Sequence, residues 1–182
     1  MFVIFRRRGL RDGQLAVVSQ SDLILQRQEW KRNGKRLVCV AGAFDLLHPG
    51  HVRLLEQARG LGDALVVALQ GDESVRRPAA RLGADAKSIP ARPITPAAER
   101  AEILAALAAV DYVTVIEEGS ASDFIARLAP EVLAQGNEAS APSNVLIDEG
   151  AIKAAGGRVV RVALEPGYST SLLVARIAEL HA

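Results

Sequence analysis

The sequence predicts an α/β protein with a doubly wound, five-stranded parallel sheet of Rossmann-like type. Runs of consecutive apolar residues, such as residues 64–69, are typical of strands that are buried on both faces of a sheet. These runs alternate with helical patterns, and such alternation favours parallel strands joined by right-handed crossovers. Apolar residues make up 49% of the 182 residues and aromatic residues only 4%, so one core must be built from Ala, Leu, Val and Ile.

Turn and capping residues bound the predicted elements. Strands are expected at 36–41, 64–69, 112–116, 132–134 and 158–164. Helices are expected at 22–33, 52–59, 96–109, 120–128, 147–155 and 171–180. Ser21 is placed to cap the first helix, and Thr95 to cap the third, with Pro96 at its first position. We therefore expect one folded domain at residues 21–182, preceded by an N-terminal arm at residues 1–20.

Charge and cysteine content exclude several classes of protein. Lys and Arg total 22 against 21 for Asp and Glu, a formal net charge of +1, which excludes a broad cationic surface for nucleic acid. The single cysteine, Cys39, excludes an internal disulfide framework and a cysteine-based zinc cage. No apolar run reaches the roughly 20 residues that span a bilayer, and the N-terminal apolar residues precede the charges, unlike a secretory signal. We expect a cytoplasmic protein with no nucleic-acid or membrane partner.

A ligand is expected beyond the carboxyl ends of the strands, near the point where the strand order reverses. The connection at residues 70–94 is long for a strand-to-helix segment and is rich in basic residues, including Arg76 and Arg77. One interpretation is a basic lid over an anionic ligand, which we favour. The other is a solvated surface loop.

Two histidines, His48 and His51, follow the first predicted strand at the start of a helix. A helix N-terminus attracts phosphate, and two imidazoles add hydrogen-bond donors that strengthen as negative charge builds on a phosphoryl group. Gly50 has no side chain, so a ligand can come close to the protein backbone there. A metal site is an alternative, although Asp45 is the sole nearby carboxylate and Pro49-Gly50 favours a turn. A structural role is a further alternative for either histidine alone.

The segment Gly-Ala-Phe-Asp-Leu-Leu-His-Pro-Gly-His at 42–51 resembles the signature of the nucleotidyltransferase superfamily with the HxGH motif. Other segments resemble one branch, the adenylyltransferase domain of the bifunctional heptose phosphate kinase/adenylyltransferase, of which glycerol-3-phosphate cytidylyltransferase is a close relative. These segments are 61–68, 92–100, 109–113, 154–159 and 166–171. The resemblance covers about residues 21–180 and implies a Rossmann-like nucleotidyltransferase fold.

The resemblance implies an enzyme that transfers a nucleoside monophosphate from ATP, or CTP, to a sugar phosphate such as heptose 1-phosphate and releases pyrophosphate. His48 and His51 would be catalytic, contacting the triphosphate and stabilising the transition state. The implied nucleotide-binding residues follow the first, fourth and fifth strands: Gly42, Ala43, Phe44, Asp45, Gly50, Gln135, Gly136, Ser169 and Thr170. Mg²⁺ would accompany the triphosphate, with no metal ligand assigned to the chain itself.

Arginines are implied at the acceptor or phosphate. Arg76, Arg77 and Arg100 take this role by resemblance, and for Arg100 a surface salt bridge is the alternative. The hydroxyls of Ser169 and Thr170 would hold the β- and γ-phosphates at the start of the last helix, with an ordinary N-cap as the alternative.

The chain departs from the branch after its fourth predicted strand. It reads Gln-Gly-Asn-Glu-Ala at 135–139, where the branch usually reads Lys-Gly-Gly-Asp-Tyr. Two other functions therefore stay open: a cytidylyltransferase acting on glycerol 3-phosphate or a similar polyol phosphate, and a nucleotide-binding protein with impaired catalysis. By analogy with relatives we expect a homo-oligomer, with a dimer favoured.

Overall fold

The computed structural model describes residues 17–81, 92–116, 121–136, 147–163 and 167–180, and for residues 77–81 it describes the backbone alone. The helices of these residues are α1 (Gln20–Arg32), α2 (Pro49–Arg59), α3 (Asp72–Arg81), α4 (Ala97–Ala106), α5 (Ala121–Leu128), α6 (Glu149–Ala154) and α7 (Thr170–Glu179). The strands are β1 (Leu37–Gly42), β2 (Ala64–Gln70), β3 (Tyr112–Ile116), β4 (Val132–Gly136) and β5 (Arg158–Val162).

The strands form one five-stranded, all-parallel sheet in the order β3-β2-β1-β4-β5, which confirms the predicted fold class. From β1 the chain moves outward through β2 and β3, then returns to the other side of β1 with β4 and β5. The strand order therefore reverses between β1 and β4. That is the position where doubly wound sheets bind ligands at the carboxyl ends of their strands.

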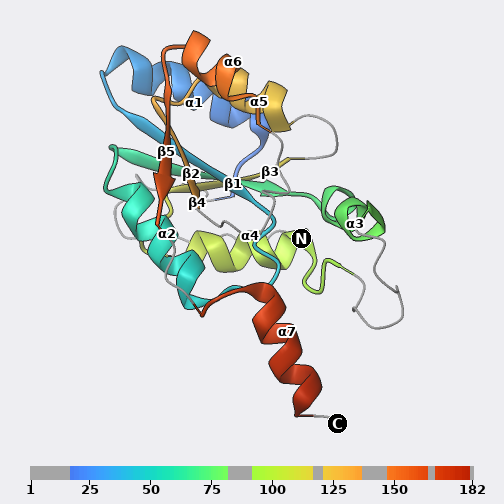
Figure 1. The fold of residues 1–182 in the computed structure, drawn as a ribbon. Helices are drawn as coiled ribbons and strands as arrows, with labels where there is room; N and C mark the ends of the chain where they lie inside the picture. The colour runs from blue at the N-terminus through green and yellow to red at the C-terminus, as the bar shows by residue number, and fades with distance from the viewer. Residues whose placement is uncertain (1–16, 82–91, 117–120, 137–146, 164–166, 181–182) are drawn as a thin grey trace.

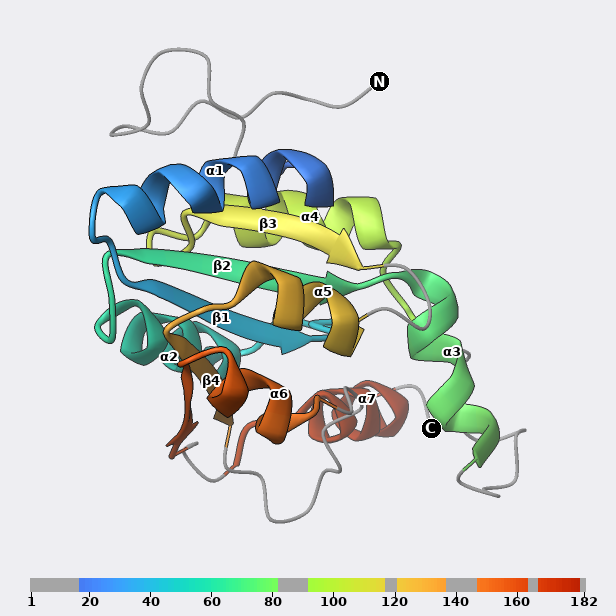
Figure 2. The same cartoon turned by 90° about the horizontal axis from the view of Figure 1, so that it is seen from above.

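Helices cover both faces of the sheet (Figure 1). Helices α1, α5 and α6 lie on one face, which Figure 2 shows toward the viewer, and α2 and α4 lie on the other. Each face has its own core. Leu54, Leu55 and Leu104 pack with Val38 and Val40 on the α2/α4 side. On the opposite side the core contains members of all three helices: Leu23, Trp30, Phe124, Ile125, Leu128 and Ile152.

Several predicted helix starts are wrong by one to three residues. Ser19, not Ser21, caps α1, and its hydroxyl accepts a hydrogen bond from the Asp22 N–H at 3.1 Å. The α2 helix already begins at Pro49, which puts His51 in its first turn. At α4, Pro96 is the cap residue and contributes no side-chain hydrogen bond.

The part of the predicted arm that the structure describes is joined to the domain. Val17 forms a parallel bridge with Val113, and the Val18 N–H donates to the Val113 carbonyl at 2.9 Å. The α1 helix also starts at Gln20, inside the predicted arm. Val17 and Val18 therefore pair with the β3 edge of the sheet.

The segment at 70–94 contains a helix that the sequence analysis did not predict. The α3 helix begins two residues after β2 and stands beyond the carboxyl ends of the strands (Figure 1). It is anchored through Val75, which is buried. The segment predicted as a lid thus includes a helix. Residues 82–91 of that segment lie outside the described part of the chain.

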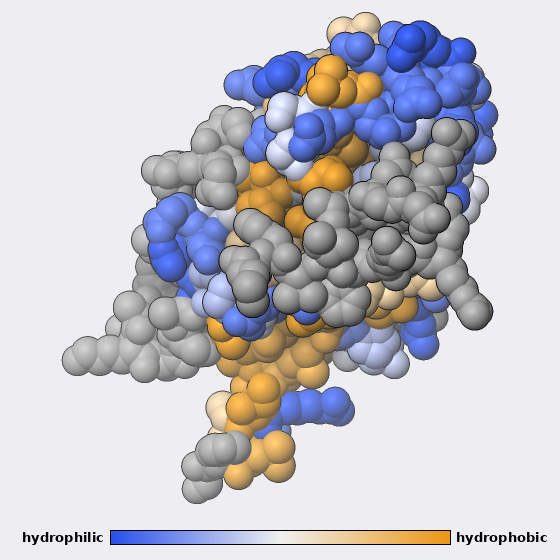
Figure 3. All heavy atoms as spheres, turned by 180° about the vertical axis from the view of Figure 1, so that it is seen from behind, coloured by the Kyte–Doolittle hydropathy of each residue, from blue (hydrophilic) through white to orange (hydrophobic). Residues whose placement is uncertain are grey.

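The α7 helix projects from the body of the molecule, and none of its residues is buried. Figure 3 shows apolar side chains gathered on this projection, and Leu172, Ile177 and Leu180 are exposed. Within the described ranges, no helix combines the length and the hydropathy needed to cross a bilayer.

Candidate functional site

Two helix N-termini meet beyond the carboxyl end of β1. His48 is the N-cap of α2, and Ser169 is the N-cap of α7. A Cβ placed on Gly50 would lie 3.0 Å from His48 Nδ1 and 3.2 Å from Tyr168 Cβ, so α2 and the start of α7 are in close contact. The Arg53 guanidinium also lies 5.3 Å from the centre of the Tyr168 ring. Free N–H groups of two helices are thereby presented side by side, an arrangement suited to a chain of phosphates.

The two histidine rings stack on each other. Their centres are 3.7 Å apart and their planes differ by 20°. The His48 Nδ1 accepts a hydrogen bond from the His51 backbone N–H at 3.3 Å, so in the neutral ring the proton sits on Nε2, as a donor. The Nδ1 atom of His51 is buried and has no hydrogen-bond partner among the described residues.

Both histidines are neutral near pH 7. Burial lowers the pKa of His48 below its usual 6.5. Burial, followed by the charge of His48, lowers the pKa of His51 to about 4. The pair therefore offers hydrogen-bond donors without a fixed charge, in agreement with the interpretation of the sequence as a phosphate cradle.

Phe44 packs against His51, and Gly42 leaves space for the Phe44 ring. Phe44 has a φ of 46°, a left-handed conformation that is unfavourable for a residue with a bulky side chain. Its buried ring lies with its centre 5.0 Å from that of His51. A Cβ on Gly42 would come within 3.0 Å of the Phe44 ring, so glycine leaves space for that ring. The contribution of these two residues in the structure is to seat His51, and nucleotide contact stays a prediction.

Asp45 is turned toward the protein. Its side chain is buried, and Oδ1 accepts hydrogen bonds from the N–H groups of Ile94 at 2.7 Å and Thr95 at 3.0 Å. Arg92 lies 3.8 Å from Oδ2. The carboxylate thus ties the HxGH segment to the residues that precede α4.

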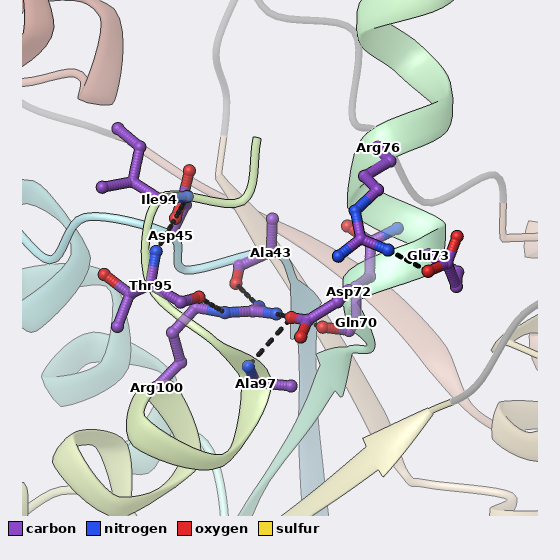
Figure 4. Close-up of polar contacts among 10 residues, drawn as sticks. All are labelled: Ala43, Asp45, Gln70, Asp72, Glu73, Arg76, Ile94, Thr95, Ala97 and Arg100. Atoms are coloured by element: carbon purple, nitrogen blue, oxygen red, sulfur yellow. Dashed lines mark hydrogen bonds and ion pairs between the residues drawn. The ribbon is translucent and has the colours of Figure 1, made fainter. Parts of the chain in front are cut away.

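Arg100 is the most deeply buried charged side chain of the site, with 1% of its surface exposed (Figure 4). Four of its five N–H groups find acceptors: the carbonyls of Ala43, Gln70 and Thr95, and Asp72 Oδ1. The salt bridge of the alternative interpretation is present, with Asp72 at 2.7 Å, but it is buried on the arginine side and does not lie on the open surface. The fifth N–H has no acceptor among the described residues, and the predicted contact of Arg100 with phosphate stays a prediction.

The remaining predicted residues surround this centre. Arg76 is exposed and pairs with Glu73 one turn earlier on α3, and the side chain of Arg77 lies outside the described structure. Gln135 and Gly136 end β4, and the buried Gln135 Oε1 has no hydrogen-bond partner within the described ranges. The altered residues 137–139 are not described. Their effect on specificity therefore stays a prediction.

The sequence analysis missed two residues that build the site. Asp72 accepts the Ala97 N–H at 2.9 Å and so caps α4 from a different segment, besides pairing with Arg100. Tyr168 packs between Arg53 and Gly50. In both cases the position in the sequence could have indicated the residue. Asp72 comes two residues after the end of β2, and Tyr168 immediately precedes Ser169.

The described residues include no group of three or more His, Cys, Asp or Glu side chains arranged to hold a metal ion. Asp45 and Asp72 are engaged by N–H groups of the protein. Imidazole nitrogens are poor ligands for Mg²⁺, which takes oxygen ligands. The described residues therefore do not fit a dedicated magnesium site.

Comparison with solved structures supports the fold. The lipopolysaccharide core biosynthesis protein from Thermoplasma volcanium superposes with a TM-score of 0.53 at 26% identity, over 72% of this chain and 98% of that one. Pantoate-beta-alanine ligase from Francisella tularensis gives a TM-score of 0.59 at 13% identity, over 87% of this chain and 69% of that one, and shows the fold alone.

Sequence comparison identifies the family. The family model described as cytidylyltransferase-like matches residues 39–174. The bifunctional protein HldE of Koribacter versatilis is 40% identical over 88% of this chain, and that of Bradyrhizobium diazoefficiens is 42% identical over 94%. This chain spans only 31% and 33% of those proteins. The predicted resemblance to the adenylyltransferase domain of the bifunctional heptose enzyme is confirmed, and the chain belongs to the cytidylyltransferase-like family of nucleotidyltransferases.

Proposed function

We propose that the chain transfers a nucleoside monophosphate from ATP, or CTP, to a sugar phosphate such as heptose 1-phosphate, with release of pyrophosphate. The observation that carries the proposal is the meeting of two helix N-termini around the stacked pair His48 and His51. This arrangement has donors for several phosphate oxygens. It suits a displacement at phosphorus that depends on positioning and charge stabilisation.

In the proposed reaction, an oxygen of the acceptor phosphate attacks the α-phosphorus of the triphosphate. The new P–O bond forms as the bond from the α-phosphorus to the bridging oxygen breaks, and pyrophosphate leaves with that electron pair. Nε2–H of His48 and the N–H groups of α2 and α7 are the donors for the oxygens that gain charge. Mg²⁺ enters as the magnesium–nucleotide complex and offsets part of the phosphate charge.

The acceptor would bind toward α3. Arg76 is held by an exposed ion pair with Glu73, and such pairs contribute little, so the guanidinium is readily redirected to an acceptor phosphate. Arg77 adjoins it in sequence. A dimer and a cytoplasmic location belong to the same proposal; the dimer rests on analogy with relatives, and the location on the single cysteine.

The test is a measurement of pyrophosphate release with Mg²⁺, crossing ATP and CTP with heptose, hexose and polyol phosphates. Release with one pair supports catalysis and identifies the base and the acceptor class. A polyol phosphate with CTP would favour the cytidylyltransferase alternative. If no pair releases pyrophosphate but a nucleotide still raises the melting temperature, a non-catalytic nucleotide-binding protein is favoured. If no pair releases pyrophosphate and no nucleotide raises the melting temperature, the proposed phosphate cradle is contradicted.

His51→Ala and His181→Ala form a matched pair for this assay. Loss of one preorganised transition-state donor costs about 10²-fold or more in turnover, which we expect for His51→Ala. His181 lies outside the cradle assigned from the sequence, so its replacement should leave turnover unchanged. Equal activity of the two variants would contradict the role of His51.

A further inference from the structure

The segment at residues 43–45 is fixed at both of its ends to the turn that precedes α4 (Figure 4). At one end, Arg100 donates to the Ala43 carbonyl and, through Nε, to the Thr95 carbonyl at 2.8 Å. At the other end, Asp45 accepts the N–H groups of Ile94 and Thr95. Residues 43–45 and 94–95 are thus closed into a ring of hydrogen bonds in which Arg100 and Asp45 are the two side-chain links.

Phe44 lies between these two fixed points. Its φ of 46° is a conformation that the residue does not adopt readily by itself, and such conformations persist where the surroundings over-determine them. The Ala43 carbonyl on one side and the Asp45 carboxylate on the other supply that constraint. The Phe44 ring in turn contacts the His51 ring.

We infer that Arg100 is a positioning residue for the nucleotide cradle: by holding the Ala43 carbonyl against the α4 turn, it keeps Phe44 in its left-handed conformation and His51 in place. This inference rests on the proposed function, in which His48 and His51 bind the phosphates of a nucleotide. It gives Arg100 the role of a brace that acts through Phe44, besides the contact with phosphate that the resemblance implies.

The brace also reaches the acceptor side of the site. Arg100 Nη2 donates to Asp72 Oδ1 at 2.7 Å, and Asp72 is the first residue of α3. The Gln70 carbonyl at the end of β2 accepts a further N–H at 2.9 Å. One guanidinium therefore joins the HxGH segment, the end of β2, the start of α3 and the turn before α4. A lysine there keeps the charge but lacks the planar fork that these contacts use.

The chain offers a matched control at the amino-terminal edge of the sheet. Arg27 is buried and donates to the carbonyls of Leu128 and Ala129 at 3.0 and 2.8 Å, and to Glu131 at 2.6 Å. Ala129 also has a positive φ, 45°. Arg27 and Arg100 are thus both buried arginines that hold a carbonyl at or next to a left-handed residue, but only Arg100 holds the segment of Phe44, whose ring lies against His51.

The experiment compares Arg100→Lys with Arg27→Lys by three measurements: thermal unfolding, the Kd for ATP and CTP, and the proton resonances of the histidine rings. Both variants should melt at lower temperature. Only Arg100→Lys should shift the resonances of His48 and His51 and raise the nucleotide Kd by tenfold or more. The spectrum of His181→Ala identifies the signal of the third histidine, so that the signals of His48 and His51 are assigned without it.

Folded Arg100→Lys protein with the His48 and His51 resonances of the wild type would overturn the inference. If Arg100→Lys does not fold, Arg100→Met replaces it, since methionine keeps an unbranched side chain in the buried position while the hydrogen bonds to Ala43, Gln70, Thr95 and Asp72 are all lost. Unchanged resonances in Arg100→Met would then overturn the inference. The ring resonances need no turnover, so a wild-type protein that transfers nothing refutes the proposed function and still leaves this comparison decisive.

Discussion

Replacing Gly50 by alanine separates catalysis from stability at the point where the two helices meet. The added Cβ would lie 3.0 Å from His48 Nδ1, 3.1 Å from Cε1 and 3.2 Å from Tyr168 Cβ, whereas ordinary contact begins near 3.4 Å. The His48 ring must therefore retreat by about 0.4 Å and the start of α7 by about half as much. Alanine stabilises a helix interior by roughly 0.5–1 kcal/mol relative to glycine, which offsets much of the cost of the close contacts.

The effect on turnover should be larger than the effect on stability. A misplacement of about 1 Å can cost about 10²-fold in rate, so a shift of about 0.4 Å should cost on the order of tenfold, or about 1.4 kcal/mol of transition-state stabilisation. Pyrophosphate release gives kcat and KM, and urea unfolding gives the free energy of unfolding.

The control for this prediction is Gly150→Ala. Gly150 lies in the first turn of α6, where a Cβ would be 3.0 Å from Asp148 Oδ1, away from the cradle. It combines a similar contact and the same gain in helix propensity with no contact to a histidine. If Gly50→Ala keeps kcat within twofold of the wild type, or if Gly150→Ala loses as much, the argument from the contact at His48 is refuted.

Three further predictions follow from single side chains. Burial lowers the pKa of His51 to about 4, from the usual 6.5, so on acidification the unfolded chain takes up the His51 proton before the folded protein does. The free energy of unfolding should therefore fall as the pH drops from 6.5 to about 4. In urea titrations, His51→Gln should make this fall smaller. Thr114→Val should raise the free energy of unfolding by about 1 kcal/mol, because the fully buried Thr114 hydroxyl has no hydrogen-bond partner in the described structure; a decrease would contradict this. Replacing Arg76 and Arg77 together by alanine should raise the acceptor KM about tenfold or more, because charged hydrogen bonds to the acceptor phosphate are lost. The melting temperature should not change, because the ion pair of Arg76 with Glu73 is exposed. An unchanged KM would show that α3 is only a solvated surface.

The sheet was predictable because its strands are apolar at nearly every position. All seven residues of β2 are buried, so the continuous run at 64–69 could hardly be anything but a strand between two layers of helices. The α3 helix was missed for the opposite reason. Its residues are mostly polar and include Pro78, and only Val75 among those described is buried, so no periodic apolar face identified it.

The histidine cradle was predictable from local sequence, but its supports were not. His48 and His51 are three residues apart and the helix start lies between them, so the pattern is visible in one short segment. Arg100 acts on Ala43, which is 57 residues away, and Asp45 acts on Thr95, 50 residues away. No periodicity or spacing carries information about contacts between such distant segments. The left-handed conformation of Phe44 is equally invisible, because sequence preference assigns such angles to glycine.

The strand order has a consequence for how the chain is synthesised. The pairs Leu37–Ala64 and Val66–Tyr112 join segments that leave the ribosome in succession, whereas Val38 must wait for Val132 before the other edge of β1 is covered. Until then the central strand has an open edge, the kind that pairs with other chains. Ser169 comes later still, after β5. An unfinished polypeptide therefore has a nearly complete hydrophobic core before the start of α7 has been made, so the proposed phosphate cradle would be completed only after the core.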